Sequence, residues 1–258
     1  MNILDKIIET KKQEIAFSKS KIPLQQLKDS EFFERKTLSL EDSLRKKSGI
    51  IAEFKRQSPS KGIINNLVSP LEVISKYEKF GAGAVSILTD HDYFGGSFND
   101  IESVRNQINI PILRKDFMID EYQFYEAKAM GADAVLLIAA CLSISEIVEF
   151  TELAEELALS VLLEIHDESE LKHISKKNTV VGINNRNLKD FKVDLQHSIQ
   201  LKNQLPNDVL SIAESGIYSM DDFKFLKEKG FDGFLMGGYF MKHENPGNQF
   251  ENFMNQIE

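Results

Sequence analysis

The sequence predicts an α/β protein, and within that class a (β/α)8 TIM barrel with an N-terminal helical extension. The first observation is the length of 258 residues, which one α/β barrel commonly uses. The second is a repeat in which a glycine that ends a helix is followed within a few residues by an apolar strand. The third is the alternation of such strands with amphipathic helices, which is typical of a parallel sheet with right-handed crossovers.

The repeat begins at Gly81, Gly131 and Gly230, where the segments GAGAVSIL, GADAVLLI and GFDGFLMG share one pattern. Gly81 and Gly131 lie 50 residues apart, and Gly131 and Gly230 lie 99 residues apart. These separations fit two and four units of about 25 residues each, the size of a βα unit with short loops. Because Gly81 precedes its strand, the Gly-x-Gly at 81–83 is not a dinucleotide-binding fingerprint.

Residues 1–48 are expected to form the helical extension, so that residues 1–258 make one domain. An apolar stripe over residues 1–20 predicts a first helix. Pro23 and the charged residues 34–36 interrupt that pattern, and a short helix is expected at about 40–47. Ser39 is its best N-cap, with Asp42 three residues further on, and Ser48-Gly49 ends it.

Apolar runs after residue 48 predict the strands of the barrel, and amphipathic stretches between them predict its helices. We expect strands near residues 50, 84, 111, 134, 161, 180, 210 and 233. We expect helices at 70–80, 120–130, 144–157 and 221–229. Eight similar units favour closure into a barrel over an open doubly wound sheet.

Composition limits the class of partner. The net charge of -9 argues against a nucleic acid or an anionic membrane, but not against a small anion in a locally basic site. The single cysteine, Cys141, excludes an internal disulfide and a cysteine-rich metal site. No stretch has the length of a signal peptide's apolar core or of a membrane span. A cytoplasmic protein is therefore expected. The oligomeric state stays open from the sequence, but nothing demands an oligomer, so a monomer is expected.

The stretch from Ile50 to Gly62 joins an apolar strand, two charges and a loop. Glu53 and Lys55 are two residues apart, so their side chains leave the same face of the strand. Residues 58–62 (SPSKG) cannot continue a strand and predict a loop. One interpretation is an edge strand with two solvated charges. The other is an acid and a base at the mouth of a barrel, with Ser58 in a loop that covers the site.

Polar residues also end other predicted strands, at the side of the barrel where active sites lie. These strand-end groups are Lys115, Glu164, Asn184 with Arg186, and Glu214. Charged or amide groups at five strand ends that meet at one mouth favour an active site over solvated surface. The segment 89–92 (TDHD) suggests a metal, but no matching cluster of His and carboxylate occurs elsewhere. Neither a metal nor a cofactor is expected.

The loops after the seventh and eighth strands give a separate signal. In many barrels these loops bind phosphate through backbone N–H groups. Glycine lets the backbone approach an anion closely. The expected phosphate-binding residues are Ser215, Gly216, Gly237 and Gly238, and Lys55 and the lysine-bearing loop 58–62 could add positive charge.

Together these motifs resemble the indole-3-glycerol phosphate synthase family. The most specific is AEFKRQSPSKG at 52–62. The others are LT at 88–89 with YFGGS at 93–97, LRKDF at 113–117, LEIH at 163–166, GINNRNL at 182–188 and AESGI at 213–217. The resemblance covers nearly the whole chain. One departure is Gly238, where some members carry a serine that would contact phosphate.

The resemblance implies closure of the indole ring of 1-(2-carboxyphenylamino)-1-deoxy-D-ribulose 5-phosphate, with release of carbon dioxide and water, in tryptophan biosynthesis. It implies that Lys115 is the general acid of ring closure and that Glu164 is an acid–base group of the dehydration. Lys55 would pair with the substrate carboxylate and serve as a second proton donor. Glu53, Asn184 and Glu214 would orient these groups, and Arg186 and Ser58 would bind substrate.

The chemistry of such a site sets two further requirements. A lysine acts as an acid near neutral pH when desolvation or other cations lower its pKa. Lys55 and Lys115 would lower each other's pKa, and Glu53 and Glu214 would oppose this. The aromatic ring needs an apolar wall that keeps the reacting carbons close and dry, expected from Phe94, Phe117, Leu136 and Leu188.

Two other functions stay open from the residues alone. A sugar-phosphate isomerase or aldolase on the same barrel would share the phosphate loops, but it would need neither Glu53 and Lys55 two residues apart nor an aromatic-lined pocket. A catalytically silent barrel that senses a phosphorylated metabolite would tolerate loss of Lys115 with little change in ligand affinity.

Overall fold

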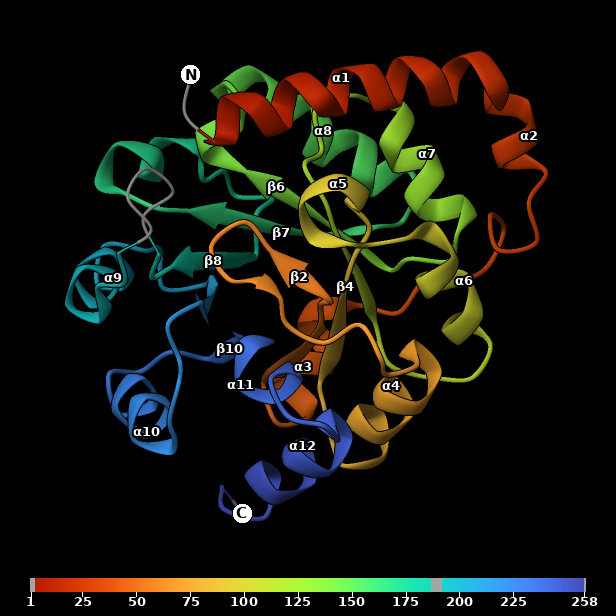
Figure 1. Cartoon of the computed structure of the whole chain (residues 1–258). Helices are drawn as coiled ribbons and strands as arrows, with labels where there is room; N and C mark the ends of the chain where they lie inside the picture. The colour runs from red at the N-terminus through yellow and green to blue at the C-terminus, as the bar shows by residue number, and fades with distance from the viewer. Residues whose placement is uncertain (1–2, 187–191, 258) are drawn as a thin grey trace.

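Parallel strands close into a barrel in the computed structural model, which describes residues 3–186 and 192–257 (Figure 1). Within these ranges, eight strands follow one another around the barrel in the order β1, β10, β9, β8, β7, β6, β5, β4. They are β1 (Ile50–Phe54), β4 (Ala84–Leu88), β5 (Ile112–Lys115), β6 (Ala134–Ile138), β7 (Ser160–Ile165), β8 (Val180–Asn184), β9 (Leu210–Glu214) and β10 (Gly233–Met236). All eight predicted strands and the closure of the sheet are confirmed.

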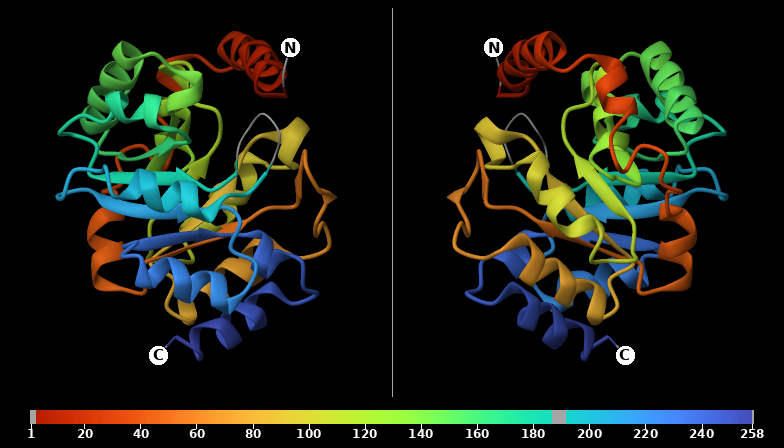
Figure 2. Two further views of the ribbon diagram at one scale, coloured as in Figure 1. Left: turned by 90° about the vertical axis from the view of Figure 1, so that its left-hand side faces the viewer. Right: turned by 90° about the vertical axis from the view of Figure 1, so that its right-hand side faces the viewer.

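Helices follow the strands, and most of them cover the outside of this barrel (Figure 2). They are α4 (Pro70–Lys79), α5 (His91–Phe94), α6 (Phe98–Arg105), α7 (Tyr122–Ala129), α8 (Ile144–Glu156), α9 (Leu195–Lys202), α10 (Met220–Glu228), α11 (Gly238–Met241) and α12 (Pro246–Met254), with 3-10 turns η1 (Ala139–Cys141) and η2 (Glu168–His173). The four predicted helices correspond to α4, α7, α8 and α10. Capping boxes at Ser143 and Ser219 start α8 and α10.

Side chains on each strand alternate between two separate apolar layers. In β1, Ile50, Ala52 and Phe54 pack outward in the layer beneath the helices. Ile51 points inward and joins the core inside the barrel. This alternation decides which polar residues reach the interior, because Glu53 shares the inward face with Ile51.

The extension covers both ends of the barrel. Helix α3 (Leu40–Lys46) is capped by Ser39, whose hydroxyl accepts from the Asp42 N–H at 3.1 Å, as predicted. Its Leu40 and Leu44 belong to the core inside the barrel, so α3 closes one end. Helix α1 (Ile3–Lys21) lies over the other end of the barrel. In Figures 1 and 2, α12 lies on the side of the molecule opposite α1.

The expected loop at 58–62 is the turn of a short β-hairpin, which was not predicted. Strands β2 (Gln57–Ser58) and β3 (Gly62–Ile63) pair in antiparallel fashion, with Ser58 opposite Gly62. Gly62 has φ +65°, a left-handed value that favours glycine at the end of the turn. Another short helix, α2 (Leu24–Lys28), follows Pro23 and was not predicted. Within the described ranges, no helix has the length and hydropathy needed to cross a membrane.

Candidate active site

The inward faces of the strands change from apolar to polar as each strand reaches the mouth of the barrel. Four strands each carry an apolar residue in the core inside the barrel and, two residues later on the same face, a charged residue at the mouth. The pairs are Ile51 and Glu53, Leu113 and Lys115, Leu162 and Glu164, and Ile212 and Glu214. Asn184 shares the face of Val180 in β8. The predicted convergence of polar strand ends at one mouth is therefore what the structure shows.

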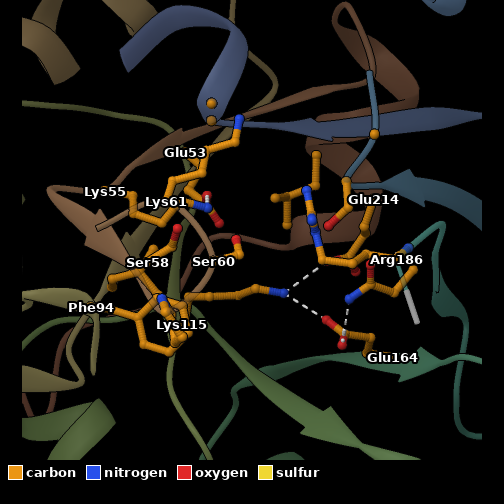
Figure 3. Close-up of a pocket in the computed structure, with 18 of the residues that line it drawn as sticks. Glu53, Lys55, Ser58, Ser60, Lys61, Phe94, Lys115, Glu164, Arg186 and Glu214 are labelled. Carbon is orange, nitrogen blue, oxygen red and sulfur yellow. Dashed lines mark hydrogen bonds and ion pairs between the residues drawn. The ribbon is translucent and has the colours of Figure 1, made fainter. Parts of the chain in front are cut away.

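Lys115 lies at the centre of this cluster (Figure 3). Its ammonium is 2.7 Å from Glu164 Oε2 and 2.8 Å from Glu214 Oε2. Burial alone would lower the pKa of Lys115, but the carboxylates of Glu164, Glu214 and Glu53 outweigh it and raise that pKa. Lys115 is therefore held as a cation, and the opposition expected from the glutamates decides the direction of its pKa shift.

The two carboxylates that hold Lys115 have opposite pKa shifts. Burial would raise the pKa of Glu164, but Lys115 and His166 reverse this and hold it well below its usual range. Burial and the nearby Glu164 charge raise the pKa of Glu214 to about 8, and Lys115 offsets only part of that effect. Glu164 is thus an ionised base, while Glu214 takes up a proton close to neutral pH.

Glu164 is also oriented by neighbours on its far side. Asn184 Nδ2 donates to Glu164 Oε1 at 3.1 Å. His166 Nε2 lies 3.1 Å from the same oxygen, and Glu164 and Glu170 raise the pKa of His166 to about 10 against the effect of burial. His166 was not predicted as a site residue, since it follows the last residue of β7 and does not line the pocket.

Glu53 and Lys55 form a second charged pair at the mouth. The Lys55 ammonium makes an ion pair with Glu53 Oε1, and Glu53 is buried while the Lys55 side chain is 20% exposed. The interpretation of this stretch as an edge strand with solvated charges is wrong, because β1 is paired on both sides, with β4 and β10.

Two glycines make room for the buried carboxylates. A Cβ on Gly182 would lie 2.0 Å from Glu214 Oε1, and a Cβ on Gly237 would lie 2.4 Å from Glu53 Oε1. Real Cβ atoms do not approach other atoms this closely, so a side chain at either position would displace its carboxylate. Gly237 therefore has a positioning role in addition to any contact of its backbone with phosphate.

We expect Gly182→Ala to lower kcat by about 10- to 100-fold, because it moves Glu214 away from Lys115. Steady-state rates measure the loss, and circular dichroism checks that the fold is kept. In a Glu214→Ala background the same glycine change should add almost no further loss. Losses that multiply in the double variant would contradict displacement of Glu214 as the cause.

An apolar wall lines one side of the pocket. The rings of Phe94 and Phe117 lie 6.1 Å apart at an interplanar angle of 40°. Leu136 in β6 lines the same pocket, which also receives Ile3, Leu4 and Ile7 from α1. The fourth predicted wall residue, Leu188, lies outside the described residues.

The turn after β9 brings backbone close to the pocket. Ser215 (φ 63°) and Gly216 (φ 71°) are both left-handed, which is uncommon for a residue with a side chain. A Cβ on Gly216 would lie 2.4 Å from Val193 Cγ1, so this position needs glycine. The backbone of Gly237 and Gly238 follows β10 on the same side, and all four predicted phosphate-binding residues line the pocket.

The remaining predicted binding residues lie at the rim. Ser58 lines the pocket from the hairpin formed by β2 and β3. Arg186 follows β8, and its guanidinium donates to Tyr218 Oη at 2.7 Å. Ser60 and Lys61 of the same hairpin also face the pocket (Figure 3). Ser60 was not predicted as a site residue, whereas Lys61 is the lysine of the loop 58–62 that was expected to add positive charge.

The segment 89–92 has a structural use in place of the considered metal site. Asp90 caps α5 and pairs with the buried Lys11 of α1 at 2.9 Å. Lys11 also lies 2.9 Å from Asp116 and 2.5 Å from Glu14. Across the described part of the chain, no group of three or more His, Cys, Asp or Glu side chains could hold a metal ion.

The whole sequence is similar to one family of known proteins. A family model described as indole-3-glycerol phosphate synthase matches residues 4–253. A Bacteroides thetaiotaomicron protein of that name is 47% identical over 258 residues, which cover 100% of this chain and 99% of the relative. A Paracidovorax citrulli protein of the same name is 41% identical, over 95% of this chain and 96% of the relative.

Solved structures with lower sequence identity share the fold. The tryptophan synthase complex from Pyrococcus furiosus contains a chain with a TM-score of 0.57 and 16% identity, over 81% of this chain and 95% of that one. A mutant tryptophan synthase α-subunit from the same organism gives a TM-score of 0.61 and 14% identity, over 81% of this chain and 97% of that one. At this identity the likeness shows the barrel fold alone.

Proposed function

The chain belongs to the indole-3-glycerol phosphate synthase family, and on that premise we propose how its site residues divide the reaction among them. The family's reaction converts 1-(2-carboxyphenylamino)-1-deoxy-D-ribulose 5-phosphate to indole-3-glycerol phosphate. One carbon–carbon bond forms, and one carbon dioxide and one water leave. The enzyme is a carboxy-lyase of tryptophan biosynthesis.

Lys115 is the general acid of ring closure. The ring carbon that bears the carboxylate attacks the ribulose carbonyl carbon, and the carbonyl oxygen becomes a hydroxyl by taking a proton from the Lys115 ammonium. The observation that carries this assignment is the placement of that ammonium between Glu164 and Glu214 at 2.7 and 2.8 Å. A donor fixed in advance needs little reorganisation in the transition state.

The next steps lose carbon dioxide and then water. When the carbon–carboxylate bond breaks, its electron pair returns to the ring system. Lys55 pairs with the carboxylate until it leaves, and then donates the proton with which the hydroxyl departs as water. Glu164 accepts the proton lost from the ring system, since its low pKa keeps it ionised.

The other residues bind and orient. Glu53 holds Lys55, and Asn184 holds Glu164 through the amide contact of 3.1 Å. Glu214 holds the Lys115 ammonium from the second side. The aromatic ring binds against Phe94, Phe117 and Leu136, the phosphate binds at Ser215, Gly216, Gly237 and Gly238, and Arg186 and Ser58 bind substrate at the rim.

The raised pKa of Glu214 predicts a basic limb in the pH profile. Above about pH 8 the Glu214 carboxyl ionises and adds a negative charge beside Lys115. That charge holds the Lys115 proton more tightly, so kcat should fall as the pH rises through 8. Glu214→Gln keeps the side chain neutral and should remove this limb from the profile of kcat against pH. A limb of unchanged position in this variant would exclude Glu214 as its source.

The test of the assignment is turnover of the purified chain with its carboxyphenylamino substrate, followed by the fluorescence of the indole product. We expect turnover without added cofactor. A sugar-phosphate isomerase, an aldolase or a silent sensor would leave the indole signal absent, and that result would overturn the assignment.

We further propose that the chain acts in the cytoplasm as a monomer, with residues 1–258 forming one domain in which 1–48 are the extension. One observation supports the single domain: α1 contributes apolar residues to the mouth of the barrel, and α3 contributes apolar residues to its closed end. Sedimentation equilibrium at working concentration would reveal a dimer if the proposal were wrong.

A further inference from the structure

Positive charge is scarce where the proposed phosphate loops meet the pocket. A phosphate monoester brings a charge between -1 and -2 near neutral pH, and backbone N–H groups carry only partial charges. Lys115 and Lys55 are each already paired with carboxylates of the catalytic cluster. The Arg186 guanidinium is bound to Tyr218 Oη. A further cation beside these loops that has no anionic partner would therefore be available to the phosphate.

Lys61 lies beside these loops, at the turn of the hairpin formed by β2 and β3. The turn is held by the pairing of Ser58 with Gly62 and by the Lys61 N–H, which donates to the Ser58 carbonyl at 3.3 Å. The Lys61 ammonium lies 3.6 Å from the position that a Cβ on Gly238 would occupy. Standard backbone dimensions then put it within about 6 Å of the Gly238 nitrogen. One phosphate can accept hydrogen bonds from both.

The contacts of Lys61 in this structure are weak ones. Its ammonium lies over the ring of Tyr218, 4.9 Å from the centroid. A cation–π contact at an exposed position contributes little. Among the described residues, no carboxylate forms an ion pair with Lys61. An arriving phosphate therefore competes with one aromatic ring and not with an anion.

We propose that Lys61 is the cationic ligand of the substrate phosphate, held over the 215–216 and 237–238 loops by the hairpin. Gly238 supplies no side-chain donor, and the Lys61 ammonium lies next to the space where such a donor would project. The assignment rests on the proposed function, because the phosphate belongs to that substrate. It gives a function to the hairpin that follows β1, because β1 pairs with β10 and the hairpin therefore lies beside the loop that carries Gly237 and Gly238.

The test compares two substrates that differ only in the phosphate. Lys61→Met should lower kcat/KM for the phosphorylated substrate about tenfold or more, since it removes a charge-assisted hydrogen bond. It should leave kcat/KM for the same compound without phosphate unchanged. Lys61→Arg should keep most of the wild-type kcat/KM for the phosphorylated substrate. Lys46→Met, in α3 at the closed end of the barrel, removes an equal charge and should change neither rate.

Calorimetric titration with inorganic phosphate gives a readout that needs no turnover. Its Kd should rise about tenfold in Lys61→Met and stay unchanged in Lys46→Met. An unchanged Kd, or equal losses with the two substrates, would overturn the role of Lys61 while the proposed function stands. Absence of wild-type turnover would overturn the proposed function, and the titration would still decide whether Lys61 binds phosphate.

Discussion

Replacing Lys115 with methionine is expected to lower kcat by about 10²- to 10⁴-fold, the range over which a positioned proton donor acts. Methionine has nearly the length of lysine and carries no proton to donate. The variant also leaves Glu164 and Glu214 facing each other without the cation between them. Single-turnover kinetics with the carboxyphenylamino substrate would measure the loss of the chemical step directly.

The control for Lys115→Met is binding of the product, which needs no proton transfer. Its dissociation constant, measured through indole fluorescence, should stay within a few-fold of the wild-type value because the wall formed by Phe94 and Phe117 is untouched. A variant that turns over at nearly the wild-type rate would remove Lys115 from the acid role.

Lys11→Met should lower the free energy of unfolding by about 3–5 kcal/mol, the cost of removing one partner from a buried group of charges. Lys11 is 3% exposed, and its partners Asp90 and Asp116 have side chains that are 1% exposed. Burial lowers the pKa of Lys11 less than these two carboxylates and Glu14 raise it, so the group is a cation in the folded chain. Urea denaturation with linear extrapolation would measure the difference.

Lys12→Met is the matched control for Lys11. The neighbouring side chain is 63% exposed, and its ammonium lies 3.7 Å from Glu9, so its removal should change stability by less than about 0.5 kcal/mol. Equal stability of the two variants would contradict the assignment of Lys11 as the link between α1 and the loops after β4 and β5.

The fold and the catalytic cluster are predictable because both depend on local periodicity. A parallel barrel strand that is buried on both faces is an apolar run, and the glycine before it marks the end of a helix. The period of two then places Glu53 above Ile51 and Lys115 above Leu113 on the inward face. These rules need no knowledge of which strands are neighbours, so the sequence alone is sufficient for them.

The features that were missed depend on contacts between distant segments. Lys11 looks like one more solvated lysine of an amphipathic helix until α1 is placed over Asp90 and Asp116. His166 can be identified as a neighbour of Glu164 only when η2 places Glu170 beside its other ring nitrogen. Pro59 and Gly62 predict that the chain leaves the strand after Ser58. The segments before and after this turn nevertheless pair with each other as β2 and β3. None of these contacts has a periodic signal.

The most direct test of the central claim is the stoichiometry of the wild-type reaction in the presence of a metal chelator. Substrate labelled in its carboxylate would be mixed with the purified chain, and indole fluorescence and released carbon dioxide would be measured together. We expect one carbon dioxide for each indole-3-glycerol phosphate formed, at a rate that the chelator does not change. Unchanged substrate, or carbon dioxide released without an indole product, would contradict it.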